Sequence, residues 1–353
     1  MKKLDEKEWN ERTLEDLFLV KAGKRLTNAD KIDGDRPFIG ATDNNNGVTG
    51  FVANENSSLD QNVLGVNYNG APCIAFYHPY ECIFTDDVKR LHLRHQPDQG
   101  TVLLFFKTIV MQQRNKYSYG YKFKEKRMLR QKLMLPVTDS GEPDYDYMEQ
   151  YSYEMVETML TRYKKYVATQ LSNLKYREIL ALDEKEWRPI YISDMFEFVK
   201  GRENNMAMLE DGDIPLISAK ANNNGLKGFV NSPKKVIAGR CITLNNDGDG
   251  GAGLAYYQPA NMALDTHVTA LMPNFSMSMF AMLFIAECIS GLHGFFGHGL
   301  SISNRRVKRI RIMLPVTDSG EPDYEYMEQY AKNMMVRKYE QYLAFLDKRE
   351  ETD

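Results

Sequence analysis

The twelve residues MLPVTDSGEPDY occupy Met134–Tyr145, and the same twelve letters return at Met313–Tyr324. In both places one further residue leads into the letters YMEQY, which begin at Tyr147 and Tyr326. The two copies lie about 179 positions apart in a chain of 353 residues. An identical word repeated at half the chain length predicts two structural units of the same fold.

The repeat extends well beyond this word. LDEKEW occurs at Leu4–Trp9 and again at Leu182–Trp187. The stretch DGDRPFIGATDNNNGVTGFV, which is Asp33–Val52, has the counterpart DGDIPLISAKANNNGLKGFV at Asp211–Val230. Solenoid repeats have periods of about 20–50 residues. The much longer period here therefore indicates a duplicated domain together with a duplicated helix.

A long helix is predicted after each copy of the twelve-residue word. Pro143 suits a first helical turn, because the N–H that it lacks would be unpaired there. No proline or glycine occurs between Asp144 and Leu182. The pattern predicts an amphipathic helix of about 38 residues and about 57 Å. Its apolar stripe, at steps of three and four, is Met148, Tyr151, Met155, Met159, Tyr163, Val167, Leu171 and Leu174.

The second helix has the same stripe, but the sequence ends soon afterwards at Asp353. LDEKEW at Leu4 matches the word that closes the first predicted helix at Leu182. We therefore predict a circularly permuted repeat, in which the N-terminal segment supplies the end of the second helix. The two ends of the chain would then meet.

Each unit mixes helix and strand signals. Thr13 is predicted to cap the helix LEDLF, and Ser193 the matching DMF segment. Apolar stretches predict helices near Thr101–Gln113 and Met277–Ser290, with short strands and Asn-Gly turns between the motifs. A basic strand is expected to lead into each MLPV.

The predicted fold class is α+β, with two similar α/β domains separated by two long helices. The helices are expected to pair antiparallel, like a coiled coil, about an approximate two-fold axis. The predicted boundaries are 1–140 and 184–319 for the domains, and 141–183 and 320–353 for the spacer helices. Duplex DNA has two-fold axes of its own, so this arrangement suits a reader of two half-sites at a fixed distance. Because the two domains differ, the full site would be asymmetric.

The duplicated order of these motifs resembles the DNA specificity (S) subunit of type I restriction-modification systems. The resemblance includes the NNNG-x-x-GFV pattern, the strands AFYHP (Ala75–Pro79) and AYYQP (Ala255–Pro259), and the LPV exit into a helix. It implies two target recognition domains, helices that set the gap between half-sites, and a subunit without catalytic activity. The implied partners are double-stranded DNA, two methyltransferase (modification) subunits and a restriction (translocase/nuclease) subunit. The chain departs from the family in its short second helix, which leaves the spacer length open.

Catalytic signatures are missing from the sequence. It contains neither the adenine-methyltransferase pattern N/D-P-P-Y/F nor the nucleotide-binding pattern G-x-x-x-x-G-K-S/T. GDGGAG at Gly248–Gly253 matches G-x-G-x-x-G, but a strand rather than a phosphate-binding helix is expected after it. The histidines have no acidic or cysteine partners at metal-ligand spacing. We therefore expect no enzyme activity, no cofactor and no metal.

The composition limits the other classes of protein. No run of about 18 apolar residues is present, so no membrane span is predicted. The four cysteines form no C-x-x-C pair and are typical of reduced thiols in a cytosolic protein. Three alternatives stay open: an enzyme with duplicated modules, a protein-binding scaffold, and a specificity subunit of a type IIB-like or stand-alone methyltransferase system.

Basic segments occupy the same place in both copies, just before MLPV. Tyr119–Lys132 contains six cations and one acid, and Ser303–Arg311 contains five cations and no acid. The whole chain has a net charge of −3, so local clusters of this kind indicate phosphate contact more than a solvated strand face. KAGKR and VKGR form a weaker pair of patches. The predicted cationic contacts are Lys24, Arg25, Lys122, Lys124, Arg127, Lys200, Arg202, Arg305 and Arg306.

Residues that read different half-sites should differ between the copies, whereas shared residues should serve as scaffold or phosphate contacts. The copies diverge between Arg25–Lys31 and Glu203–Glu210, and between Arg114–Phe123 and Gly291–Ile302. The shared NNNG motifs favour hairpin turns, although an asparagine amide can also bond adenine. The predicted base-reading residues are Tyr117, Tyr119, Tyr121 and Lys122 in the first domain and His298, Ser301, Ser303 and Asn304 in the second.

The identical words would present one surface to two copies of the same partner. Exposed aromatic and methionine side chains at a helix start are suitable anchors. Helix-on-helix packing is the alternative, and it is equally favoured for Tyr151 and Met155. The predicted partner contacts are Tyr145, Tyr147, Tyr151, Tyr324, Tyr326 and Tyr330.

Overall fold

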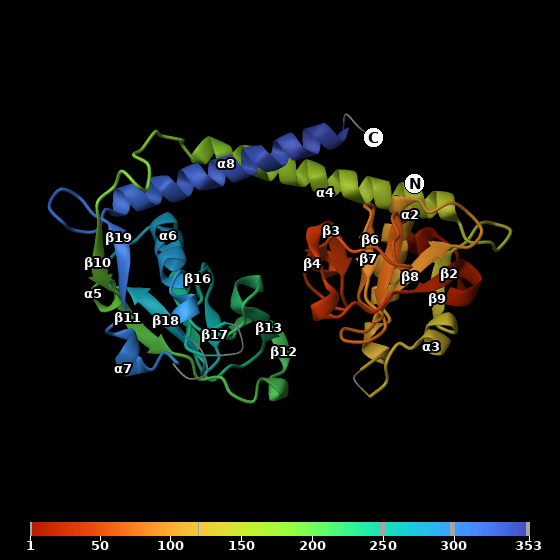
Figure 1. The fold of residues 1–353 in the computed structure, drawn as a ribbon, viewed down its shortest axis with the longest axis horizontal. Helices are drawn as coiled ribbons and strands as arrows, with labels where there is room; N and C mark the ends of the chain where they lie inside the picture. The colour runs from red at the N-terminus through yellow and green to blue at the C-terminus, as the bar shows by residue number, and fades with distance from the viewer. Residues whose placement is uncertain (1, 119, 248–250, 297–300, 351–353) are drawn as a thin grey trace. The chain divides into compact units, whose positions relative to one another are not determined.

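The protein is described by a computed structural model that covers residues 2–118, 120–247, 251–296 and 301–350, without the side chains of 207, 304, 349 and 350. The chain divides into two compact units, Met1–Tyr163 and Lys164–Asp353. The long helix α4, Tyr145–Asn173, passes from the first unit into the second (Figure 1).

The first unit combines small sheets with helices, and its strand pairs are antiparallel except for the parallel pair β3 and β7. One sheet has the order β2-β8-β5-β6, a second has β4-β3-β7, and β1 pairs with β9. The strands are β1 Trp9–Thr13, β2 Phe18–Ala22, β3 Asp33–Ile39, β4 Val48–Val52, β5 Val63–Asn67, β6 Ala75–His78, β7 Ile83–Phe84, β8 Val88–Leu93 and β9 Lys132–Pro136. The helices are α1 Leu14–Leu17, α2 Gly100–Met111, α3 Glu125–Leu129 and the start of α4, with 3₁₀ turns η1 Leu4–Glu6, η2 Asn28–Asp30, η3 Asn45–Gly47 and η4 Arg114–Lys116.

The second unit repeats this plan. Its sheets have the orders β11-β18-β15-β16 and β13-β12-β17-β14, and β10 pairs with β19. The strands are β10 Trp187–Tyr191, β11 Phe196–Lys200, β12 Asp211–Ile217, β13 Leu226–Val230, β14 Val236–Ile237, β15 Cys241–Asn245, β16 Ala255–Gln258, β17 Met262–Leu264, β18 Val268–Pro273 and β19 Arg311–Pro315. The helices are α5 Ile192–Met195, α6 Met279–Ser290, α7 Asn304–Val307 and α8 Tyr324–Glu350, with 3₁₀ turns η5 Met206–Met208, η6 Asn223–Gly225 and η7 His293–Phe295.

Each core forms where the apolar helix after the sheet packs onto it. In the first unit the rings of Phe18 and Phe106 are both fully buried and meet edge to face, with centroids 4.8 Å apart. In the second, α6 lies between its sheet and α8 (Figure 1). These helices confirm the predictions for Thr101–Gln113 and Met277–Ser290.

Capping was predicted correctly in one unit only. The Thr13 hydroxyl accepts a hydrogen bond from the amide of Asp16 and caps α1. Ser193 instead lies inside α5, which begins at Ile192, and its hydroxyl donates to the Lys308 carbonyl at 3.2 Å. The prediction for Ser193 is therefore wrong, because the neighbouring segment offers its side chain another partner.

In both units the segment that contains LDEKEW packs against the start of the long helix that follows MLPVTDSGEPDY. We call this the helix-start contact. In the second unit the Lys185 ammonium lies 2.7 Å from the Asp323 carboxylate, and the Tyr326 hydroxyl donates to the Leu180 carbonyl at 3.0 Å. The Trp187 indole also donates to the carbonyl of Leu182 at 2.8 Å.

The same three contacts hold the start of α4 in the first unit. Lys7 pairs with Asp144, the Tyr147 hydroxyl donates to Lys2, and the indole of Trp9 donates to Leu4. Partial burial raises the pKa of Asp144. The hydrogen bonds from Lys7 and from the Tyr147 amide outweigh that effect and hold the pKa below its usual value.

These contacts correct the prediction that LDEKEW closes a long helix. In the first unit the word forms η1 and in the second a turn, and each then leads into the first strand of its own domain. The N-terminal word therefore lies on the start of α4, and no described contact of it bears on the end of α8. The meeting of the chain ends stays a prediction.

The helix α4 is also shorter than predicted, since it ends at Asn173 rather than near Leu182. Buried amide side chains on α8 bind the backbone that follows. Gln329 donates to the Lys175 carbonyl at 2.8 Å, and Asn333 donates to the Arg177 carbonyl at 2.6 Å. These carbonyls therefore bond to α8 instead of extending α4.

The last turns of α4 run antiparallel to α8 within the second unit. The rings of Tyr166 and Tyr339 lie 6.3 Å apart, while Arg177, further along the chain, bonds to Gln329, which is earlier in α8. The predicted antiparallel pairing is thus confirmed for this part of the two helices. The approximate two-fold axis between the domains stays a prediction.

A charged network distinguishes the first unit from the second. His92 on β8 contacts two carboxylates, with Nε2 2.9 Å from Asp60 and Nδ1 2.7 Å from Asp98. Arg90 also donates to Asp60 at 2.8 Å. Hydrogen bonds to Asp98 and Asp60 raise the pKa of His92 despite the opposing effect of burial. In the second unit, Met272 stands at the position that matches His92.

We expect His92→Gln to destabilise the first unit and to alter its dependence on pH. A raised folded-state pKa means that the imidazolium stabilises fully below pH about 6.5, and that this stabilisation is lost as the pH rises through the folded-state pKa. Loss of the imidazolium should lower the free energy of unfolding at pH 6 by roughly 1–3 kcal/mol. Denaturant unfolding at pH 6 and at pH 8.5 measures this, with Met272→Gln as the control. An unchanged pH dependence in His92→Gln would count against the network.

Candidate nucleic-acid interface

The basic segments are short helices, not the strands that the sequence suggested. In the first unit α3 precedes β9, and in the second α7 precedes β19. Apolar residues on either side of the helix start anchor each segment in the core. The anchors Phe123 and Met128 are fully buried, and their counterparts Ile302 and Val307 are 3% and 1% exposed. Because the apolar side chains point inward, the cations between them remain at the surface.

The exposed cations of these segments therefore face solvent in both units. In the first unit they are Lys124, Lys126, Arg130 and Lys132, and in the second Arg305, Arg306, Lys308, Arg309 and Arg311. Ser303 has a second role, because its hydroxyl accepts a hydrogen bond from the Arg306 amide and caps α7. Clusters of this kind are suited to phosphate contact.

An aromatic stack stands beside α3 in the first unit. The rings of Tyr117 and Tyr121 are nearly parallel, with centroids 5.8 Å apart. The guanidinium of Arg127 lies 3.9 Å from the centre of the Tyr121 ring. The Tyr117 hydroxyl donates to Gln131 at 2.6 Å, and burial raises the pKa of Tyr117 to about 12. Tyr121 is half exposed, so part of its ring remains open to solvent beside its contacts with Tyr117 and Arg127.

A polar pocket of about 540 Å³ occupies the corresponding end of the second unit. It brings together four of the predicted contacts, which are Lys200, Ser301, Ser303 and Arg305. Residues that the sequence analysis missed complete its lining: Asn246, Asp247, Thr266, His267 and Ile302. The pocket thus joins cations to groups that can both donate and accept hydrogen bonds, as base-edge recognition requires.

One pair in this pocket has a counterpart in the first unit. Nδ1 of His267 lies 2.6 Å from the Asp247 carboxylate. At the matching place in the first unit, Asn69 donates to Asp87 at 3.0 Å. The two side chains occupy the same positions in both units, but the pair is histidine and aspartate in the second unit and asparagine and aspartate in the first. That divergence between the copies was the signal in the sequence that could have identified these residues.

The other predicted contacts are placed as follows. Lys24 and Arg25 are exposed after β2, and Arg202 is exposed after β11. Lys122 is half-buried, and its carbonyl accepts a hydrogen bond from Arg127. Tyr119, His298 and the side chain of Asn304 lie outside the described residues.

The NNNG motifs form turns, as predicted. Asn45, Asn46 and Gly47 all have positive φ, as do their counterparts in the second unit. The Asn46 amide donates to the Tyr80 hydroxyl at 3.0 Å, and the Asn224 amide donates to the Tyr257 carbonyl at 3.0 Å. Both side chains are therefore engaged in holding the turn to the neighbouring strand.

The tyrosines of the repeated words are mostly internal. Tyr147 and Tyr326 are only 7% exposed, so the expectation that they are exposed anchors is wrong. Tyr145, Tyr151, Tyr324 and Tyr330 are half-buried and pack against the core of their own unit. The helix-start contact explains the burial of Tyr147 and Tyr326, which bond to the backbone just before LDEKEW. Tyr151 and Tyr330 pack on Phe105 of α2 and Phe284 of α6.

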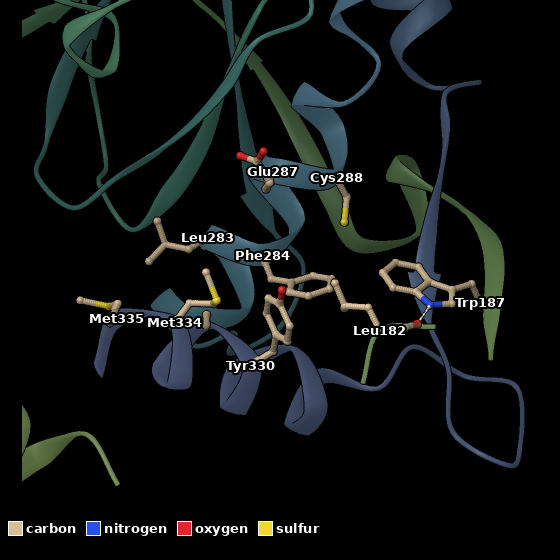
Figure 2. Close-up of a pocket in the computed structure, with 10 residues that line it drawn as sticks. Leu182, Trp187, Leu283, Phe284, Glu287, Cys288, Tyr330, Met334 and Met335 are labelled. Atoms are coloured by element: carbon tan, nitrogen blue, oxygen red, sulfur yellow. Dashed lines mark hydrogen bonds between the residues drawn. The ribbon is translucent and has the colours of Figure 1, made fainter. Parts of the chain in front are cut away.

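An apolar groove beside these rings recurs in both units. In the second it lies between α6 and α8, has a volume of about 500 Å³, and is lined by Trp187, Phe284, Tyr330 and Met334 among others (Figure 2). In the first unit the matching groove of about 660 Å³ includes Trp9, Phe105, Tyr151 and Met155. Met155 and Met159 are 44% and 62% exposed, so apolar surface remains accessible there.

Two other features, a metal site and a membrane-spanning helix, are absent from the described residues. No group of three or more histidine, cysteine, aspartate or glutamate side chains is arranged to hold a metal ion. None of the helices in this part of the chain combines the length and apolar character needed to span a membrane.

Comparison with known proteins places this chain in a family. The family described as "Type I restriction modification DNA specificity domain" matches residues 6–165 and again residues 184–341. A curated relative is the specificity subunit S.BcgI of the type II restriction enzyme BgcI from Heyndrickxia coagulans, 48% identical over 162 residues. The match covers 46% of this chain, and the chain spans about half the length of that relative, 48%.

Solved structures with similarity to the chain include two restriction-modification subunits. The type I S subunit from M. genitalium is 14% identical and has a TM-score of 0.45, with 100% of this chain and 96% of that chain covered. The HsdS subunit from Thermoanaerobacter tengcongensis is 12% identical and has a TM-score of 0.33, with 97% and 91% covered. The two family matches together span most of the sequence, and they coincide with the two repeats. The chain therefore belongs to the type I restriction-modification DNA specificity domain family and carries the domain twice.

Proposed function

We propose that this chain is the DNA sequence-recognition subunit of a restriction-modification complex, and that each unit reads one half of a split, asymmetric site. The observation that carries the proposal is the anchored basic segment, which recurs in both units while the loops beside it differ. Shared cations suit phosphate contact, which is independent of sequence, and divergent neighbours suit base readout. The aromatic stack of the first unit and the polar pocket of the second are the proposed reading sites.

The proposed subunit has no catalytic activity of its own and directs partner enzymes to the site. Its partners would be two methyltransferase subunits and, in systems that cleave DNA, restriction subunits. The apolar grooves support a partner present in two copies, because each groove pairs a repeated tryptophan with the start of a long helix. Part of the lining is the same in both, since Leu4, Trp9 and Tyr151 correspond to Leu182, Trp187 and Tyr330.

The organisation of the proposed reader follows the sequence boundaries. Residues 1–140 and 184–319 would be the target recognition domains, and residues 141–183 and 320–353 the spacer segments. The long helices would set the gap between the half-sites. An antiparallel arrangement over their full length would give the reader an approximate two-fold axis to match that of duplex DNA.

Methylation mapping tests this function. The chain would be co-expressed with the methyltransferase encoded beside its gene, and methylated bases would be mapped across the host genome. We expect a single split motif with two different halves and a fixed gap, because two different domains are joined by a helix of defined length. Omission of the chain is the control and should abolish the motif. A complex that co-purifies but adds no methylation would instead support a protein-binding scaffold.

A type II assembly is the second candidate. The curated relative is named as the specificity subunit of a type II restriction enzyme and is 48% identical over its matched region. In such a complex the same DNA-reading role would serve a different arrangement of nuclease and methyltransferase. Co-purification from the native host, followed by identification of the bound subunits, distinguishes the two assemblies.

A further inference from the structure

We propose that Arg127 and Arg306 are positioning residues that do not themselves read bases. Each holds in place the divergent loop before it, and we call these two loops, Arg114–Phe123 and Gly291–Ile302, the reading loops. The proposal rests on the proposed function, since it concerns how each unit discriminates its half-site. Both arginines belong to the shared part of the repeat, and both were predicted as direct DNA contacts.

The first observation is a hydrogen bond that recurs in both units. Nη1 of Arg127 donates to the Lys122 carbonyl at 2.8 Å, and Nη1 of Arg306 donates to the Ser301 carbonyl. The donors occupy matching positions in the repeat, and so do the acceptors. In each case the arginine reaches back five residues, from the short helix to the end of the loop before it.

The accepting carbonyl lies at the boundary between variable and shared structure. The loop before it differs between the copies over Arg114–Phe123 and Gly291–Ile302. The residue directly after it is a buried anchor, Phe123 or Ile302. The arginine therefore fixes the loop at the point where it leaves the core. A residue that is the same in both units cannot tell two half-sites apart, but it can fix the geometry from which other residues do so.

In the first unit the same arginine also supports a reading candidate. Its guanidinium lies under the half-exposed Tyr121 ring, and Tyr121 stacks on Tyr117. Tyr117 is tied in turn to Gln131, which is 7% exposed. Gln131 and Arg127 thus hold the two-ring stack from opposite ends. A planar guanidinium can donate to a carbonyl in its own plane while its flat face stacks on a ring, and a compact lysine ammonium does not reproduce this flat stacking.

Paired variants of the full chain test the role of Arg127. Arg127→Lys retains the charge and removes the planar contact, and Lys126→Ala removes the exposed neighbouring charge. Each would be bound to a duplex with the mapped split motif, and to duplexes in which one half-site is replaced. The ratio of the affinities for the intact motif and for a duplex with one half-site replaced measures discrimination at that half-site. The dependence of the affinity on salt concentration measures the phosphate contacts.

We expect Arg127→Lys to lower discrimination at one half-site at least tenfold, with its salt dependence and its discrimination at the other half-site unchanged. Lys126→Ala should weaken binding to all duplexes alike and reduce the salt slope by about one. In the second unit, Arg306→Lys and Arg305→Ala should repeat the contrast at the other half-site. Circular dichroism and thermal unfolding identify any variant that does not fold.

Normal discrimination in a folded Arg127→Lys variant would overturn the proposal. So would a salt slope that falls in Arg127→Ala while its discrimination stays normal, since that result would make Arg127 a phosphate contact. A wild-type chain that binds all duplexes equally would contradict the proposed function itself, and it is recognised before any variant is compared.

Discussion

A chain in which Gly291–Ile302 replaces Arg114–Phe123 is expected to change one half of its methylated motif completely and to retain the other. The loop lies between α2 and the buried anchor Phe123, and Ile302 can fill the same anchor position. The transplanted loop should therefore pack against a core similar to the one that it packs against in the second unit. The changed half should come to resemble the half already read by the second unit.

Methylation mapping with the co-expressed methyltransferase measures the outcome. The reciprocal exchange, Arg114–Phe123 in place of Gly291–Ile302, is the matched control and should change the opposite half. Loss of both halves together would indicate misfolding. An unaltered motif would show that this loop does not read bases.

Removal of seven residues, Val156–Arg162, from α4 is expected to shorten the gap between the half-sites and to leave both halves as they were. Seven residues nearly complete two helical turns, so the helix keeps the same face toward its neighbours. The helix loses about 10 Å of length, which corresponds to roughly three base pairs of duplex. Most side chains of this segment are exposed, so the core of the first unit should tolerate the deletion.

The same mapping experiment measures the gap directly. Insertion of seven residues after Arg162 is the matched control and should lengthen the gap by a similar amount. A gap that stays constant in both variants would contradict the ruler role of the helix, even if DNA recognition itself were intact.

The repeat made much of the fold predictable from sequence. Two copies of one pattern revealed two units of one fold, and long apolar stretches revealed α2 and α6. The end of α4 was not predictable in the same way. It depends on Gln329 and Asn333, which lie about 150 residues further along the chain and bind the backbone after Asn173.

The candidate site was predicted in part for a similar reason. Charge clustering located the basic segments, but the helices α3 and α7 are too short to give a periodic signal. The pair of His267 and Asp247 comes from two separate loops, and neither loop is distinctive by itself. The burial of Tyr147 follows from its contact with Lys2, at the other end of the first domain.

If the two domains read DNA as proposed, the helix-start contact also bears on how new target specificities arise. All of its side-chain members, Lys7, Trp9, Asp144 and Tyr147 in one unit, are the same residue types in the other. A genetic crossover within the repeated words would exchange whole reading domains and preserve every one of these pairings. Selection for a new target sequence can therefore act through recombination between genes that share these words, without compensating mutations where domain and helix join.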